Sequence, residues 1–104
     1  MAFLTIKGLE LREFRPGLRS HAILGNKLVM AIMELEVGFV DPGHAHPNEQ
    51  CGYVLQGELE MAVGDERQTL KAGDAYFIPG DALHSFRVRG RPVLVLDVST
   101  PREG

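Results

Sequence analysis

The sequence predicts an all-β protein, and three observations lead to this fold class. Apolar residues occur in short runs, glycines and prolines fall between those runs, and no segment shows a convincing helical period. The 12 glycines and 6 prolines are spread along the 104 residues as turn signals. A chain of this length fits one domain. The architectures that suit the pattern are a β-sandwich, a barrel or a double-sheet jelly roll.

In the first half of the chain we expect two strands, with long stretches of turn and loop around them. Residues up to Asn26 are poorly patterned, apart from a turn at Phe14–Gly17. We expect a strand over Lys27–Val37, because valine and isoleucine content and the flanking glycines favour strand over helix. A turn or loop is expected at Val40–Gly43, and a second strand at Gly52–Gln56.

The second half predicts short antiparallel strands joined by tight turns. Glu58–Val63 alternates strictly between apolar and polar or small residues. A hairpin turn at 64–66 then leads into a returning strand over 67–70. Three more strands are expected, at Ala75–Ile78, His84–Val88 and Pro92–Val98.

Composition excludes several classes of protein. The formal net charge is −3 and the sequence pI is near 5.7, whereas general nucleic-acid binders usually carry a basic excess. No apolar run approaches the ~18 residues that a membrane-spanning helix needs. Cys51 is the single cysteine and cannot form an internal disulfide. The N-terminal residues do not resemble a secretory signal. We therefore expect a cytoplasmic protein that binds neither nucleic acid nor membrane.

Three of the four histidines occupy positions that a small barrel can bring together. His44 and His46 are two residues apart and share a side in an extended chain, and His84 opens a later strand. Gln50 keeps the same parity as His46 if the chain stays extended. Imidazole nitrogen suits Zn, Fe, Ni and Cu, and an amide oxygen would complete a set of three nitrogens and one oxygen. The alternative is a solvated histidine pair on a loop, because His-x-His alone is a weak signal.

The segments around these residues resemble the two motifs of the cupin superfamily. Residues 38–57 follow the first pattern: Gly, five residues, His-x-His, three or four residues, Glu, six residues and Gly. Gln50 stands at the glutamate position and Gly57 at the last glycine. Residues 73–84 follow the second pattern, which is Gly, five residues, Pro-x-Gly, two residues and His, with Asp81 in place of the second glycine.

The resemblance implies a cupin-type double-stranded β-helix, which is a jelly-roll barrel. It implies one domain over residues 1–104, with an N-terminal arm and first strands at 1–26 and a barrel core at 27–98. It also implies that the barrel holds a divalent metal ion, for which Zn, Mn, Fe and Ni are the candidates.

The same resemblance assigns the metal ligands residue by residue. His44, His46 and His84 match the histidine ligands, and Gln50 matches the remaining position. Glu49 is the competing candidate, but strand parity turns it away from His46, so we prefer Gln50.

The end of the chain resembles a narrower group, the small cupins of pectin and alginate breakdown that open unsaturated uronates to linear keto sugars. In that group an aspartate and a nearby arginine serve the reaction. Asp97 matches the aspartate, and Arg102 is the candidate arginine, one residue early in the pattern. Ser99 stands where an aromatic residue is usual. Asp97 lies in a strand with two apolar faces, so either face could be interior, and a solvated aspartate bonded to Arg102 is the alternative.

These features predict a metal-dependent enzyme that isomerises or ring-opens a small oxygen-rich substrate such as a sugar acid. The same ligands would also suit an Fe(II)-dependent dioxygenase, which oxygen uptake would reveal. A non-catalytic cupin that binds a small molecule is the third interpretation, and ligand binding without turnover would identify it. A homodimer is expected in each case, because an open sheet edge invites pairing.

Overall fold

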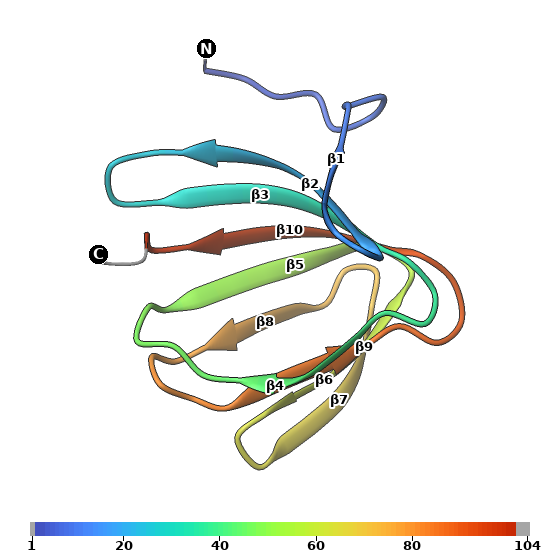
Figure 1. Ribbon diagram of the computed structural model, residues 1–104, viewed down its shortest axis with the longest axis vertical. Helices are drawn as coiled ribbons and strands as arrows, with labels where there is room; N and C mark the ends of the chain where they lie inside the picture. Colours follow the sequence, from blue (N-terminus) through green and yellow to red (C-terminus); the bar gives the residue numbers. More distant parts are fainter. Residues whose placement is uncertain (1, 102–104) are drawn as a thin grey trace.

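The computed structural model describes residues 2–101, which form two β-sheets that face each other (Figure 1). The six-stranded sheet has the order β1-β2-β3-β10-β5-β8, and the four-stranded sheet has the order β4-β9-β6-β7. Residues 2–101 include no helix that is long and apolar enough to cross a bilayer. The predicted all-β, jelly-roll fold class is confirmed.

The strand bounds agree with most of the predicted elements. The six-stranded sheet consists of β1 (Arg12–Arg15), β2 (Leu18–Leu24), β3 (Val29–Leu35), β5 (Gln50–Gln56), β8 (Ala75–Ile78) and β10 (Val93–Ser99). The four-stranded sheet consists of β4 (Val40–His44), β6 (Glu58–Val63), β7 (Glu66–Lys71) and β9 (His84–Arg87). From β5 onward, each predicted strand lies within one or two residues of the observed one.

Two segments differ from the sequence-based prediction. The turn expected at Val40–Gly43 is instead strand β4, which lies at the edge of its sheet, where a proline such as Pro42 is tolerated. The poorly patterned segment before Asn26 contains β1, which includes Phe14 and Arg15 of the predicted turn, and β2, which pairs with β3 along its whole length. In β2 the residues that share a face with buried Leu18 include Ser20 and Ala22, and this polar and small content hides the alternation.

The hydrophobic core fills one end of the space between the sheets and leaves the other end polar. Its buried members come from both sheets, and they are Leu18, Leu35, Phe39, Val54, Leu59, Met61, Leu70, Val88, Val93 and Val95. Each fully buried aliphatic side chain contributes roughly 1.5–3 kcal/mol. On β10, Val93 and Val95 belong to this core, whereas Asp97 and Ser99 continue the same face toward the polar end.

The turn before β9 is pressed against the loop that follows β4. The backbone N–H of Asp81 donates to the carbonyl of His46 at 2.7 Å. A Cβ added at Gly80 would lie 2.5 Å from the Pro47 carbonyl oxygen, so only glycine fits there. Asp81 is the one non-glycine residue with positive φ (65°) within residues 2–101, and aspartate is among the residues that tolerate this conformation.

Gly52 makes room for an aromatic ring on the inner face of the six-stranded sheet. Gly52 on β5 pairs with Tyr76 on β8 and with Asp97 on β10. A Cβ at Gly52 would lie 2.2 Å from Cζ of Tyr76. The Tyr76 ring therefore lies across the backbone of β5, and its hydroxyl reaches the carboxylate of Asp97.

Gly52→Ala is expected to lower the free energy of unfolding by about 1–3 kcal/mol, because the added methyl group overlaps the Tyr76 ring. Urea denaturation measures this change. Gly90→Ala is the matched control, since a Cβ there meets nothing within 4 Å. The same Gly52→Ala change in a Tyr76→Ala background should cost less. Wild-type stability for Gly52→Ala would contradict the close packing.

Candidate functional site

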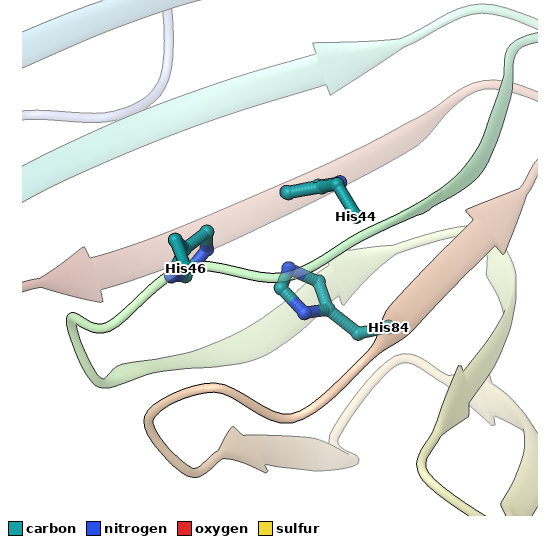
Figure 2. A group of neighbouring side chains, drawn as sticks. All are labelled: His44, His46 and His84. Atoms are coloured by element: carbon teal, nitrogen blue, oxygen red, sulfur yellow. The ribbon is translucent and has the colours of Figure 1, made fainter.

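Three histidines converge at the polar end of the space between the sheets. His44 ends β4, His46 follows two residues later in the loop, and His84 begins β9, where it pairs with His44. One ring nitrogen from each lies within 4.8 Å of those of the other two. Figure 2 shows the three rings gathered around one point. The ring centroids of His44 and His84 are 4.2 Å apart, and those of His46 and His84 are 4.8 Å apart.

In each of the three rings, Nδ1 faces an oxygen acceptor. The contacts are His44 with both carboxylate oxygens of Asp41 (3.1 and 3.0 Å), His46 with the Asn48 carbonyl (2.9 Å), and His84 with the Ala82 carbonyl (2.9 Å). Nδ1 therefore carries the proton, and in a neutral ring Nε2 keeps a free lone pair. Metal-binding histidines characteristically have such a partner on the second nitrogen.

The Nε2 atom of His84 is buried and has no hydrogen-bond partner. Burial lowers the pKa of His84, and the neighbouring His44 and His46 act in the same direction against the hydrogen bond to Ala82. The ring is therefore held in its neutral form. A buried polar atom without a partner is costly, and a cation at this point would use its lone pair.

Gln50 extends the cluster with an oxygen. Its Oε1 lies 3.2 Å from Nε2 of His46, while its Nε2 donates to Oδ2 of Asp97 at 2.8 Å. The bond to Asp97 fixes which end of the amide faces the histidines. In a neutral His46 ring whose proton is on Nδ1, facing the Asn48 carbonyl, Nε2 and Oε1 of Gln50 are two acceptors that face each other at 3.2 Å. A cation between them would make this arrangement favourable. Glu49, the competing candidate, is exposed.

Asp97 lies on the inner face of β10 and is 5% exposed. Oδ2 accepts hydrogen bonds from Gln50 and from the hydroxyl of Tyr76. Burial raises the pKa of Asp97, although these two hydrogen bonds oppose the rise. Burial and the neighbouring Asp97 also raise the pKa of Tyr76, so the hydroxyl remains a donor. Sequence reasoning did not single out Tyr76, whose partner is 21 residues away.

Asp41 is a second residue that the sequence did not mark as functional. It is buried, and a register shift between Asp41 and His44 in β4 lets its carboxylate face the His44 ring. Burial alone would raise its pKa. The hydrogen bonds from His44 and the Gly43 N–H, together with the nearby charge of Arg15, outweigh burial and lower the pKa. Asp41 is therefore a carboxylate that orients one ring of the cluster.

A cavity of about 570 Å³ opens beside the cluster and is lined by residues from both sheets. This volume is typical of sites for small molecules. The lining includes His44, His46, Gln50, His84, Asp41 and Arg15. Arg102, predicted to act with Asp97, lies outside the described residues.

Two characterised proteins share sequence similarity with this chain. One is the dimethylsulfoniopropionate lyase DddQ of Ruegeria pomeroyi, which is 28% identical over 102 residues, with 89% of this chain and 51% of the relative covered. The chain thus spans about half the length of this relative. The other is the pectin degradation protein KdgF of Dickeya dadantii, which is 26% identical over 76 residues, covering 72% of this chain and 69% of the relative.

Solved structures show the same likeness. KdgF from a Halomonas species superposes with a TM-score of 0.86 at 26% identity, covering 99% of this chain and 96% of that one. A protein of Thermus thermophilus, TT1209, gives a TM-score of 0.84 at 27% identity, covering 99% and 100%. The predicted resemblance to cupins of pectin degradation is confirmed. Residues 31–99, more than half of the chain, match the cupin domain family, and the protein therefore belongs to the cupin family.

Proposed function

We propose that this chain binds one divalent metal ion through His44, His46, Gln50 and His84 and acts on a small oxygen-rich substrate such as a sugar acid. The observation that carries the proposal is the set of lone pairs that converge without a proton between them: the unpartnered Nε2 of His84, and Nε2 of His46 opposite Oε1 of Gln50. Three nitrogens and one oxygen, all from neutral groups, suit Zn, Mn, Fe or Ni.

The reaction that this site supports best is the ring-opening of an unsaturated uronate. A divalent ion in the cluster would polarise a substrate oxygen or lower the pKa of a bound water. Opening the cyclic hemiacetal takes the proton from the hydroxyl, forms the aldehyde C=O and breaks the bond between that carbon and the ring oxygen. The ring oxygen leaves as an enolate and becomes a ketone when the proton is delivered to the alkene carbon, so the conjugated double bond is lost and no oxidant is consumed. Asp97 is the proposed group that takes and returns this proton, because Gln50 and Tyr76 both bind Oδ2 and hold the carboxylate in place.

Similarity to KdgF, a pectin degradation protein, favours an acidic sugar over other small substrates. Arg102 is proposed as a second catalytic residue on the resemblance of the C-terminal segment alone.

We also propose that the protein forms a homodimer. The outer face of the six-stranded sheet carries exposed Tyr53 and Phe77, and β1 and β8 are its free edges, which a second copy would cover.

His84→Ala is expected to abolish stoichiometric binding of the divalent ion, because it removes the buried lone pair. Elemental analysis of freshly purified protein and calorimetric titration with Zn, Mn, Fe and Ni measure this loss. His21→Ala on β2 is the control and should bind one ion per chain like the wild type. At an ion concentration 100 times the dissociation constant, binding should stabilise the wild type by about 2.7 kcal/mol. Equal metal binding by His84→Ala and the wild type would refute the proposed metal centre.

Asp41→Asn is expected to weaken metal affinity by about 10- to 100-fold, because the carboxylate that orients His44 loses its charge. Competition with a chromogenic chelator measures the affinity. Glu34→Gln, which removes a carboxylate paired with Arg19 on the outer face of the sheet, is the control and should leave affinity unchanged. An affinity for Asp41→Asn equal to that of wild type would show that Asp41 does not support the centre.

Asp97→Asn is expected to reduce turnover of an unsaturated uronate by about 10²- to 10⁴-fold with metal content retained, because the proton acceptor is lost. Loss of absorbance from the conjugated double bond follows the reaction, with and without chelator. Asp65→Asn in the exposed β6–β7 turn is the control. No metal-dependent turnover across a panel of uronates would reject this reaction. Oxygen uptake by the Fe(II)-loaded protein would favour a dioxygenase, and binding without turnover would favour a non-catalytic cupin.

A further inference from the structure

We infer that Arg15 binds a carboxylate group of the substrate at the mouth of the cavity, so that the substrate is a small carboxylate whose other oxygens face the histidine cluster. This inference rests on the proposed metal centre. It assigns a recognition role to a residue at the end of β1, far in sequence from every residue of the cluster.

Arg15 is placed where a ligand entering the cavity would meet it. Its side chain lines the same cavity as His44, His46 and His84, and it is 49% exposed. Within residues 2–101 it is the only lysine or arginine that lines this cavity. Lys27 borders the adjoining cavity, which shares His46 with it.

Two contacts hold the guanidinium in one orientation and leave most of its donors free. Cζ of Arg15 lies 5.2 Å from the centroid of the Phe39 ring, which is buried in the core. Nη2 lies 3.4 Å from Oδ2 of Asp41. That distance is longer than the roughly 2.7–2.9 Å of a charge-assisted hydrogen bond, so Asp41 orients Arg15 without saturating it. The guanidinium carries five N–H donors and can accept a carboxylate in bidentate fashion.

A purely structural role, in which Arg15 neutralises buried Asp41, explains these contacts less well. Asp41 already accepts hydrogen bonds from the His44 ring and from the Gly43 N–H at 3.1 Å. Arg19 offers a comparison on the opposite face of the sheet. It is equally exposed, at 47%, and its Nη2 lies closer to its partner, 3.0 Å from Oε1 of Glu34. Of these two ion pairs, Arg15–Asp41 has the longer N–O distance, and it is the pair that faces the cavity.

The charge of the site favours an anion. The four proposed ligands are neutral, so a divalent ion keeps its positive charge, while Arg15 and Asp41 offset each other. A carboxylate bound to Arg15 therefore approaches a cavity with net positive charge. The cavity volume of about 570 Å³ accommodates a molecule of the size of a single sugar acid.

The test compares D-galacturonate with D-galactose, its uncharged counterpart, by calorimetric titration of the Zn²⁺-loaded protein. We expect the wild type to prefer galacturonate. Arg15→Ala should weaken galacturonate binding by about 10- to 100-fold and remove the preference, since a hydrogen-bonded charge is lost. Arg15→Lys should restore only part of the affinity, because lysine cannot bind a carboxylate in bidentate fashion. Arg19→Ala is the matched control and should behave as wild type.

Zn²⁺ affinity and melting temperature are measured first on every variant. A variant that has lost the metal centre or the fold is then not mistaken for one that has lost only the contact between Arg15 and the carboxylate. Arg15→Ala should still bind Zn²⁺, because Asp41 keeps its hydrogen bonds with His44 and the Gly43 N–H, and galacturonate binding is compared at saturating Zn²⁺ for each variant. Four results would overturn the inference: no preference for galacturonate in the wild type, unchanged binding by Arg15→Ala, an equal loss in Arg19→Ala, or a loss in Lys27→Ala alone. Absence of Zn²⁺ binding by the wild type would instead overturn the proposed function.

Discussion

The position of the proton on three imidazole rings controls what this cavity can do. Each Nδ1 is tied to an oxygen outside the cluster, so each neutral ring presents an unprotonated nitrogen inward. If one of these rings rotated by half a turn, the cluster would contain a donor and would hold itself together by hydrogen bonds. The acceptors from Asp41, Asn48 and Ala82 prevent this, and the resulting excess of lone pairs is what makes the site receptive to a cation.

The orientation of the Gln50 amide is fixed in a similar way, by partners in the six-stranded sheet. Because Asp97 accepts from the amide nitrogen of Gln50, the amide oxygen must face His46. Tyr76 reaches Asp97 only because Gly52 has no side chain. The orientation of a proposed ligand thus depends on a glycine, a tyrosine and an aspartate that come from three neighbouring strands.

The sequence was sufficient for the all-β class through local pattern, and for the jelly-roll architecture and the grouping of the histidines through the resemblance to the two cupin motifs. Short alternating runs mark most strands, and the spacing of His44, His46 and His84 within two motifs marks the cluster. The inner or outer orientation of Asp97 could not be predicted, since both faces of β10 are apolar. Tyr76 and Arg15 were missed for a different reason. Their roles come from contacts across strands, and no local spacing records which strands become neighbours.

The two sheets contribute different kinds of residue to the cavity. His44 and His84 belong to the four-stranded sheet, with His46 in the loop just beyond it, whereas Gln50 and Arg15 line the cavity from the six-stranded sheet. Asp97 comes from the same sheet and bonds the amide of Gln50. Both sheets therefore contribute to the proposed metal centre, whereas the proposed anchor for the substrate carboxylate, Arg15, comes from an edge strand of the six-stranded sheet. A substitution on β1, which pairs only with β2, would thus change the charge at the mouth of the cavity while the strands that carry the histidines stay the same.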